Sequence, residues 1–352
     1  MKILAIETSC DETAAAVVEK GVKILSNVVA SSAAMHEKYG GIVPEVAARK
    51  QLESIIPVIK EALDQAQLNY QSIDSLAVTV GPGLIGSLLV GVETAKTIAF
   101  VTGKPLIPVN HVLAHMYANL VDSQPTTNNL QQVQFPAISL VVSGGHTELY
   151  LMESIKKLKW LGGTLDDAAG EAFDKTARLL GYGNRGGIAI QEAASKLKVK
   201  SAKLKVRLPR PMIDDESLSF SFSGLKTAIL REWKKYPHPN QALVQAFAYE
   251  VQEAITDVLV TKTLRGTELY KAKSILLSGG VAANIRLREK FNLQLTTRLA
   301  GRQADNLPLL VPPAALCTDN AVYIGSYAYF RGKPVDWHEV NALPDLTVEI
   351  TD

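Results

Sequence analysis

Apolar runs separated by short polar turns open the chain. β-prone apolar residues at 2–8 and 14–19 flank a turn that carries Asp11 and Glu12, and this pattern predicts two strands joined by a tight turn. A further apolar run at 21–31 predicts a third strand. The chain is therefore expected to begin with strand hairpins whose first turn is acidic.

Helical and strand-like periods alternate in the next hundred residues. Apolar spacing at 41–68 predicts a helix, and Pro44 suits its first turn. The elements that follow are expected in the order strand, helix, strand and helix, at residues 72–83, 84–103, 105–110 and 110–119.

The pattern starts again after a Pro-, Asn- and Gln-rich loop at 122–136. Residues 137–154 indicate a buried strand, a glycine turn and a second strand, as at the start of the chain. Another strand with a Gly-Gly turn is predicted at 273–280, followed by a helix from about Ala282. This repeat predicts an α/β protein of two related halves, each opening with a hairpin whose turn faces a cleft.

Composition is typical of a globular protein with sizeable cores. The 352 residues are 47% hydrophobic and 20% charged, and two domains are the expectation for this length. No uninterrupted apolar run is long enough for a bilayer, and acidic residues interrupt the first apolar stretch too early for a signal peptide. Two cysteines, Cys10 and Cys317, form neither a disulfide framework nor a CxxC zinc pattern. A reducing, cytoplasmic location is expected.

Charge is unevenly distributed although the net charge is only +2. Residues 1–150 have a net charge of −4, residues 151–352 have +6, and basic residues gather at 196–210. A basic second half indicates a polyanionic partner such as RNA. A solvated, lysine-rich surface loop is the simpler alternative, which charge alone favours.

His111 and His115 lie four residues apart in a segment that is expected to be helical, so both imidazoles would share one face. Core or hydrogen-bonded histidines are commoner than metal ligands, and the spacing alone leaves both readings open. Asp319, in "CTDN" at the predicted start of a helix, is either a helix cap or a third ligand of a two-histidine, one-carboxylate site. A zinc peptidase of the HExxH type needs Glu after the first histidine, where this chain has Val112.

Two glycine turns are candidate anion sites. "VVSGGHTEL" places Ser143, Gly144, Gly145, His146 and Thr147 at a turn between strands, where backbone N–H groups can approach a ligand. "LSGGVAAN" leads into a helix near Asn284. An ordinary hairpin and an ordinary strand-to-helix connection explain the same patterns, and the chain has no P-loop motif.

A carboxylate-rich stretch precedes a glycine-rich loop at 165–187. Asp167, Glu171 and Asp174 have helical spacing and would share one face, next to the loop that contains Gly187. This face either contacts ribose hydroxyls or is a solvated acidic surface with Glu171–Lys175 and Asp174–Arg178 pairs.

Taken together, nine motifs in this order resemble the bacterial-type TsaD family of tRNA N6-adenosine threonylcarbamoyltransferases over nearly the whole chain. The motifs are "IETSCDET", "GGIVPEVAAR", "GPGLIGSLLVG", "NHxxAH", "VSGGHTEL", "DDAAGEAFDKTARLLG", "FSFSGLKTA", "LSGGVAANxxLR" and "CTDNA".

The resemblance implies a fold, an activity and partners. The fold would be the actin, sugar-kinase and heat-shock-70 architecture, with an interdomain cleft between two RNase-H-like domains, at 1–120 plus about 325–352 and at about 121–324. The implied activity is transfer of threonylcarbamoyl from threonylcarbamoyl-AMP to N6 of adenosine 37 in tRNAs that read codons starting with A. A TsaB-like paralogue and a TsaE-like ATPase would assist.

The resemblance also assigns roles to residues. The metal ligands would be His111, His115 and Asp319, holding one divalent ion, Fe²⁺ in preference to Zn²⁺. Asp11 and Glu12 match the family's acidic pair near the reacting centre, and either of them or His146 would accept a proton. The donor would contact the residues Val141, Val142, Ser143, Gly144, Gly145, Asp174, Gly187 and Asn284.

The chain departs from the family pattern at Gln51, where members usually have His, and at Arg185 and Ile188, where they have prolines. Two other readings remain: a non-catalytic actin-like scaffold that binds nucleotide, and a metallopeptidase. The acidic pair and the three metal ligands argue against the scaffold, and Val112 argues against the peptidase.

Overall fold

The computed structural model describes residues 1–36, 39, 41–122, 128–183, 186–197, 206–299 and 307–348. The chain forms two compact units: the first comprises residues 1–133, 155–157 and 312–352, and the second comprises 134–154 and 158–311. The predicted domain limits near 120 and 325 stay a prediction; these units place 312–324 with the first half. Most of the basic segment 196–210 lies outside the described residues.

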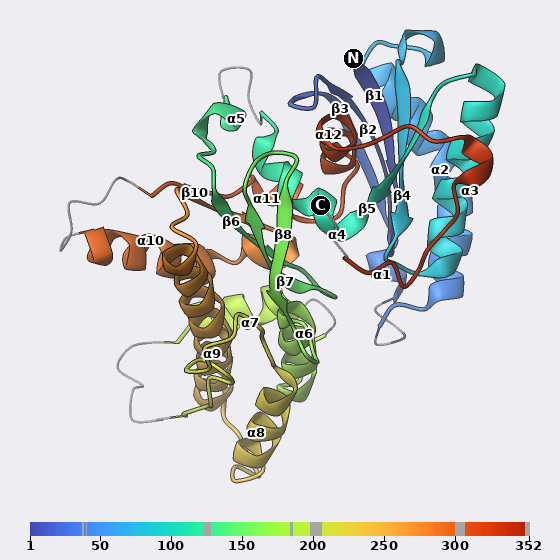
Figure 1. The fold of residues 1–352 in the computed structure, drawn as a ribbon. Helices are drawn as coiled ribbons and strands as arrows, with labels where there is room; N and C mark the ends of the chain where they lie inside the picture. The colour runs from blue at the N-terminus through green and yellow to red at the C-terminus, as the bar shows by residue number, and fades with distance from the viewer. Residues whose placement is uncertain are drawn as a thin grey trace. The chain divides into compact units, whose positions relative to one another are not determined.

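A five-stranded mixed sheet forms the centre of the first unit (Figure 1). Its order is β3-β2-β1-β4-β5, with β1, β2 and β3 antiparallel and β1, β4 and β5 parallel. The strands are β1 (Lys2–Glu7), β2 (Glu12–Glu19), β3 (Lys23–Ser31), β4 (Ser75–Gly81) and β5 (Leu106–Asn110). The predicted opening hairpins are confirmed.

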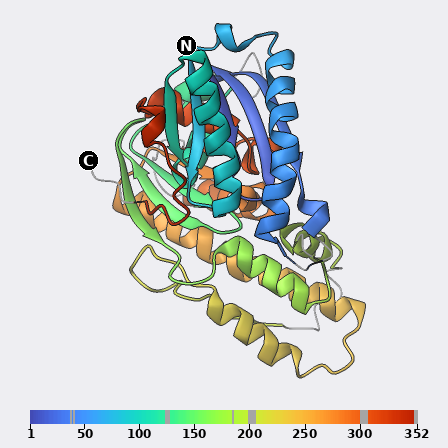
Figure 2. The same ribbon diagram turned by 90° about the vertical axis from the view of Figure 1, so that its right-hand side faces the viewer.

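Helices cover both faces of this sheet because residues alternate along its strands. Leu4 and Ile6 of β1 pack with α2 (Pro44–Gln65) and α3 (Ile85–Thr102), and Figure 2 shows these helices along one face. Ile3 and Ala5 pack on the other face with α12 (Val322–Phe330). Pro44 occupies the first turn of α2, as predicted.

The remaining helical elements of the first unit are short. They are α1 (Ala33–His36), α4 (His111–His115), α5 (Asn129–Gln132), α11 (Ala314–Cys317) and the 3₁₀ turns η2 (Tyr70–Ser72), η3 (Met116–Leu120) and η6 (Trp337–Glu339). Among the described residues, α3 has the length and apolar composition of a membrane span. It packs against β4 and α2, and a core helix passes the same test.

The second unit repeats the sheet of the first. Its order is β10-β9-β6-β7-β8, with β6, β7 and β8 antiparallel and β6, β9 and β10 parallel. The strands are β6 (Ala137–Val142), β7 (Thr147–Met152), β8 (Leu158–Gly163), β9 (Ser274–Ser278) and β10 (Leu309–Leu310). The prediction of two related halves is therefore confirmed.

The helices of the second unit follow β8 and β9. They are α6 (Ala169–Leu179), α7 (Gly186–Ser195), α8 (Ser223–Trp233), α9 (Gln241–Leu269), η5 (Gly280–Ala283) and α10 (Ile285–Leu299). The helix predicted from Ala282 begins at Ile285 instead, because η5 intervenes and the Asn284 Oδ1 atom accepts a hydrogen bond from Leu287 N.

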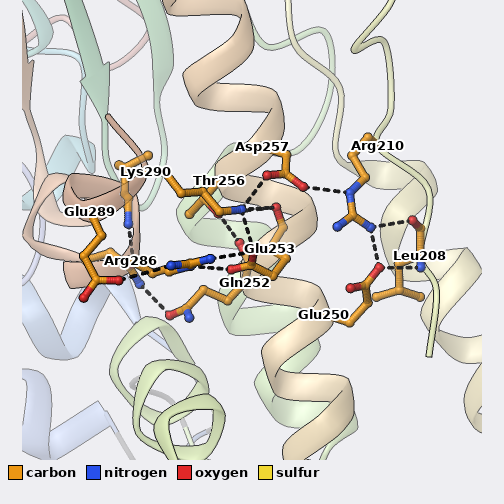
Figure 3. Close-up of polar contacts among 12 residues, drawn as sticks. Leu208, Arg210, Glu250, Gln252, Glu253, Thr256, Asp257, Arg286, Glu289 and Lys290 are labelled. Atoms are coloured by element: carbon orange, nitrogen blue, oxygen red, sulfur yellow. Dashed lines mark hydrogen bonds and ion pairs between the residues drawn. The ribbon is translucent and has the colours of Figure 1, made fainter. Parts of the chain in front are cut away.

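Ion pairs fasten α10 to α9 (Figure 3). The Arg286 guanidinium binds Glu253, and the nearly buried Lys290 ammonium binds both Glu253 and Asp257. Two residues before Arg286 is Asn284, whose Nδ2 donates to Gln252 Oε1 of α9 at 3.2 Å. The network therefore fixes the start of α10, next to a predicted ligand residue.

Candidate metal centre and ligand loops

The two histidines follow directly after β5. The Asn110 side chain ends the strand and accepts a hydrogen bond from Leu113 N at 3.1 Å, which caps the short helix α4. His111 and His115 are one turn apart and buried, and their ring centroids lie 4.7 Å apart. The predicted shared face is confirmed, although the α-helix gives way to the 3₁₀ turn η3 after His115.

Asp319 does not start a helix, which corrects that prediction. It lies between α11 and α12, in a turn held by the buried Asn320. The Asn320 Nδ2 atom donates to Thr318 O at 2.7 Å, and its Oδ1 accepts from Val322 N at 3.0 Å. The Asn320 side chain thus forms hydrogen bonds with backbone groups that would pair with each other in a helix. The resulting turn directs Asp319 toward α4.

The three side chains converge on one point. The Asp319 Oδ1 atom lies 3.7 Å from His111 Nε2 and 3.5 Å from His115 Nε2, and one ligand atom of each residue lies within 4.8 Å of the other two. Two ligands that bind one ion at about 2.1 Å with tetrahedral angles are separated by roughly 3.4 Å. The geometry and the donor types therefore fit a divalent metal such as iron or zinc.

Glu7 supports this centre and was not singled out by the sequence. Its carboxylate is 1% exposed, and its Oε2 lies 3.1 Å from His111 Nδ1 and accepts from Thr79 Oγ1 at 2.5 Å. The Ser9 backbone N–H donates to the other oxygen at 2.6 Å. A carboxylate that accepts from Nδ1–H leaves Nε2 of the same imidazole for a metal. In the sequence, Glu7 is distinguished only as an acidic residue at the end of a predicted apolar strand.

Glu7 and His111 shift each other's pKa through their opposite charges. Burial alone disfavours the charge on both groups, but each stabilises the charge of the other. The pKa of Glu7 is lowered as a result. The pKa of His111 is raised to about 9, because Glu7 and Asp319 outweigh burial.

The predicted acidic pair lies in the same unit: Asp11 is on the turn between β1 and β2, and Glu12 is the first residue of β2. Burial, followed by the charges of Asp11 and Asp319, raises the pKa of Glu12 to about 9. The buried Gln51 amide donates to Cys10 O at 3.1 Å and to Glu12 O at 2.9 Å, so this departure from the family pattern supports the acidic turn. These crowded carboxylates favour a nearby cation.

Tyr323 closes the buried side of the centre and was also missed. Its ring centroid lies 4.5 Å from that of His115, and its hydroxyl lies 3.4 Å from Asp319 Oδ1. It follows Asp319 by four residues, so its position in α12 depends on the non-helical turn between them.

Three glycine-containing segments meet at the end of β6 in the second unit. Val141 and Val142 are buried in β6, whereas Gly144 and Gly145 are exposed in the turn that follows. A Cβ atom on Gly170 would lie 2.4 Å from Ser143 O, and one on Gly279 would lie 2.4 Å from Val142 O. Only glycine permits these approaches of α6 and of the β9–η5 turn.

Hydrogen bonds define the β6–β7 turn. Ser143 N donates to His146 O at 2.8 Å, and His146 N donates to Ser143 Oγ at 3.2 Å. The Thr147 hydroxyl accepts from Ala169 N at 2.8 Å and so caps α6. The predicted turn is confirmed, and the N-terminus of α6 is brought to it.

The other predicted donor contacts lie around α6. Burial raises the pKa of Asp174, whose Oδ1 accepts from Gly186 N at 2.9 Å at the start of α7. Gly187 follows, with space for a close ligand. Asn284 is 8% exposed and engaged in capping α10. Arg185 lies outside the described residues, and Ile188 is exposed.

Asp166 links the loop before α6 to the start of α8. Its oxygens accept from the hydroxyls of Ser221 and Ser223, each at 2.6 Å, and from the backbone N–H groups of Phe222 and Ser223 at 2.7 and 3.1 Å. Burial opposes the charge, but these four donors lower the pKa of Asp166 to about 2. The motif "FSFSGLKTA" is thus organised by a carboxylate from a different motif.

Replacing Asp166 with Asn should lower the melting temperature, because an amide nitrogen cannot accept from the two serine hydroxyls. A folded-state pKa below the unfolded value near 4 gives stability above that value and loses it as pH falls toward 2. The difference between wild type and variant, followed by thermal unfolding, should therefore shrink from pH 4 to pH 2. The exposed Asp64→Asn should show no such difference.

The fold and the two sites define an α/β protein of the actin, sugar-kinase and heat-shock-70 class, built from two RNase-H-like sheets. Solved structures show the same fold at low identity. HypF from T. kodakarensis aligns with a TM-score of 0.59 at 15% identity, over 93% of this chain and 47% of that chain. Component A of (R)-2-hydroxyglutaryl-CoA dehydratase from Acidaminococcus fermentans aligns with a TM-score of 0.53 at 12% identity, over 94% and 98%.

Sequence comparison gives the family. Residues 23–326 match the model of the TsaD family, tRNA N6-adenosine threonylcarbamoyltransferase. A curated relative with this name from Syntrophomonas wolfei is 49% identical, covering 98% of this chain and 97% of the relative. Another from Moorella thermoacetica is 46% identical, covering 98% and 96%. The chain belongs to the tRNA N6-adenosine threonylcarbamoyltransferase family.

Proposed function

We propose that this protein transfers the threonylcarbamoyl group from threonylcarbamoyl-AMP to N6 of adenosine 37 in tRNAs that read codons starting with A. The observation that carries the proposal is family membership over nearly the whole chain together with a buried two-histidine, one-carboxylate set. In the reaction, N6 forms a bond to the carbamoyl carbon, the carbon–oxygen bond to phosphate breaks, and AMP leaves with that oxygen.

His111, His115 and Asp319 would hold one divalent ion, with Fe²⁺ preferred over Zn²⁺. The ion would supply Lewis-acid polarisation and orientation of the acyl group. Glu7 orients His111 by accepting from its Nδ1 atom. Asp11, Glu12 and His146 are the proposed acceptors of the N6 proton. Glu12 could accept a proton only after a bound cation has lowered its raised pKa. Gln51 binds backbone oxygens beside Asp11, and His146 lies in the second unit.

The glycine turns of the second unit would bind the adenylate part of the donor. The N–H groups of Gly144 and Gly145 lie in an exposed turn next to the N-terminus of α6, where an anion is favoured. The proposed donor contacts are Val141, Val142, Ser143, Gly144, Gly145, Asp174, Gly187 and Asn284. Backbone donors at a departing phosphate stabilise the charge that develops there.

The proposed partners are a TsaB-like paralogue and a TsaE-like ATPase, in the cytoplasm where tRNA is modified. An apolar surface on the first unit supports a partner chain. Leu52 and Ile56 of α2 are 65% and 61% exposed, and Ile85 and Leu89 of α3 are 49% and 43% exposed. Apolar side chains that recur one helical turn apart on neighbouring helices are typical of an interface.

Mass spectrometry of tRNA nucleosides tests the proposed function. Cells that lack this gene should lose N6-threonylcarbamoyladenosine, and a plasmid copy should restore it. An Asp319→Ala copy should restore little, whereas the non-catalytic scaffold predicts full restoration by that copy. Unchanged modified nucleoside in the deletion strain, with no second copy of the gene, would overturn the proposal.

A further inference from the structure

We propose that the basic face of α8 binds the phosphate backbone of the tRNA substrate. This surface, called the α8 basic face, comprises Lys226 and Arg231 of α8 together with Lys234 and Lys235, which directly follow its last residue, Trp233. The inference rests on the proposed function for the identity of the nucleic acid. It adds the surface of the second unit that would hold it.

The helix is amphipathic, and its basic side chains lie away from the core. Leu225 and Ile229 are buried, and Trp233 continues this side, where its ring lies 4.9 Å from that of Phe247 in α9. The Tyr236 ring lies 6.0 Å from the same phenylalanine. At 100° per residue, Arg231 and Lys234 fall nearly opposite this apolar side, whereas Lys226 lies at its edge. All four residues of the α8 basic face are exposed.

The charges on this face are largely unneutralised. Lys235 pairs with Glu232, but within the described part of the chain Lys226, Arg231 and Lys234 form no ion pair. The cations of α10 differ, because Arg286 and Lys290 are neutralised by Glu253 and Asp257 of α9 (Figure 3). The second unit therefore contains cations that are neutralised within the protein and cations that are not. The unpaired cations of the α8 basic face remain available to an external anion.

The face is also fixed in place. Asp166 accepts four hydrogen bonds from residues 221–223, which locks the first turn of α8 to the loop before α6. Helix α6 packs on α8 and carries Asp174, a proposed donor contact. A preorganised basic surface loses less entropy on binding than a surface that becomes ordered only when it binds. Contacts here would hold RNA near the proposed donor site of the same unit.

An RNA backbone fits these features better than an acidic protein does. Three free, exposed cations spaced over about two helical turns match repeated phosphates. A protein interface would be expected to bury aromatic or aliphatic anchors, and here Trp233 and Tyr236 pack inward on Phe247. Binding of phosphates here would release counterions, so tRNA affinity should fall steeply with salt.

The test is tRNA binding by the full-length protein together with its partner proteins. Lys226→Ala, Arg231→Ala and Lys234→Ala are combined, and the dissociation constant for unmodified tRNA is measured by fluorescence anisotropy at several salt concentrations. We expect binding at least about tenfold weaker at low salt, and a log–log salt slope smaller by roughly 2–3, since each phosphate that a cation neutralises contributes about 0.7–0.9 to that slope. The KM for tRNA should rise while kcat at saturating tRNA changes little.

Two controls separate this surface from general effects. Lys273→Ala combined with Lys333→Ala removes two exposed cations elsewhere and should leave the salt slope unchanged. Lys226→Arg combined with Lys234→Arg keeps the charge and should keep the affinity. Wild-type affinity in the triple variant, or equal loss in the Lys273/Lys333 control, overturns the inference. Failure of the wild-type protein to transfer threonylcarbamoyl would instead refute the proposed function.

Discussion

Replacing His111 with Ala should abolish stoichiometric metal binding and lower threonylcarbamoyl transfer by on the order of 100-fold or more, since metal polarisation of an acyl group is worth several kcal/mol. The remaining pair, His115 and Asp319, offers two ligands where the protein offers three. Bound metal is measured by elemental analysis of protein reconstituted without oxygen, and transfer is measured with excess donor.

Leu113→Ala is the matched control for this result. Leu113 lies in the same short helix and is 7% exposed, but it carries no ligand atom. This variant should lose stability through the cavity it creates and keep one metal per chain. Full transfer by metal-free His111→Ala protein would show that the histidines have only a structural role.

Replacing Glu7 with Gln should lower metal affinity about 10- to 100-fold, the usual effect of removing a carboxylate that orients a ligating histidine. The amide can donate to Nδ1 of His111, which then leaves Nε2 protonated and unable to bind the metal. Affinity is measured by competition with a chelator of known strength, so the readout does not depend on transfer activity.

The control for Glu7 is Ser26→Ala. Ser26 is buried in the same sheet, where its hydroxyl accepts from Val17 N at 3.1 Å, and it does not touch the metal ligands. The Ser26→Ala variant should lose stability, because Val17 N loses its acceptor, without a change in metal affinity. If the two variants lose metal affinity equally, Glu7 has no specific effect on His111.

Local sequence patterns were sufficient to predict most strands and helices, because their apolar periods match the buried faces. The repeated hairpins of β1–β2 and β6–β7 predicted the two related sheets. The predicted helix boundaries are wrong where a side chain, and not another backbone group, forms the hydrogen bonds. Asn320 organises a turn where a helix was expected, and Asn284 delays the start of α10. Such caps depend on one or two hydrogen bonds and leave little trace in periodicity.

The centre itself was predictable only in part. The spacing of His111 and His115 indicated a shared face, but Asp319 was assigned by resemblance, because no local rule connects residues two hundred positions apart. Glu7 is 104 residues from His111, so its role appears only when β1 and β5 are placed in one sheet. The choice among Asp11, Glu12 and His146 as proton acceptor stays a prediction.

The first unit is assembled from both ends of the chain, which has a consequence for its synthesis. Residues 1–133 provide the five strands, but Asp319 and the covering helix α12 come from residues 312–352. A ribosome must therefore complete the whole second unit before the first can acquire Asp319, the proposed third metal ligand. The growing chain carries His111 and His115 without Asp319 for about two hundred codons, so tight binding at the proposed metal centre would belong to the finished protein and not to the nascent one.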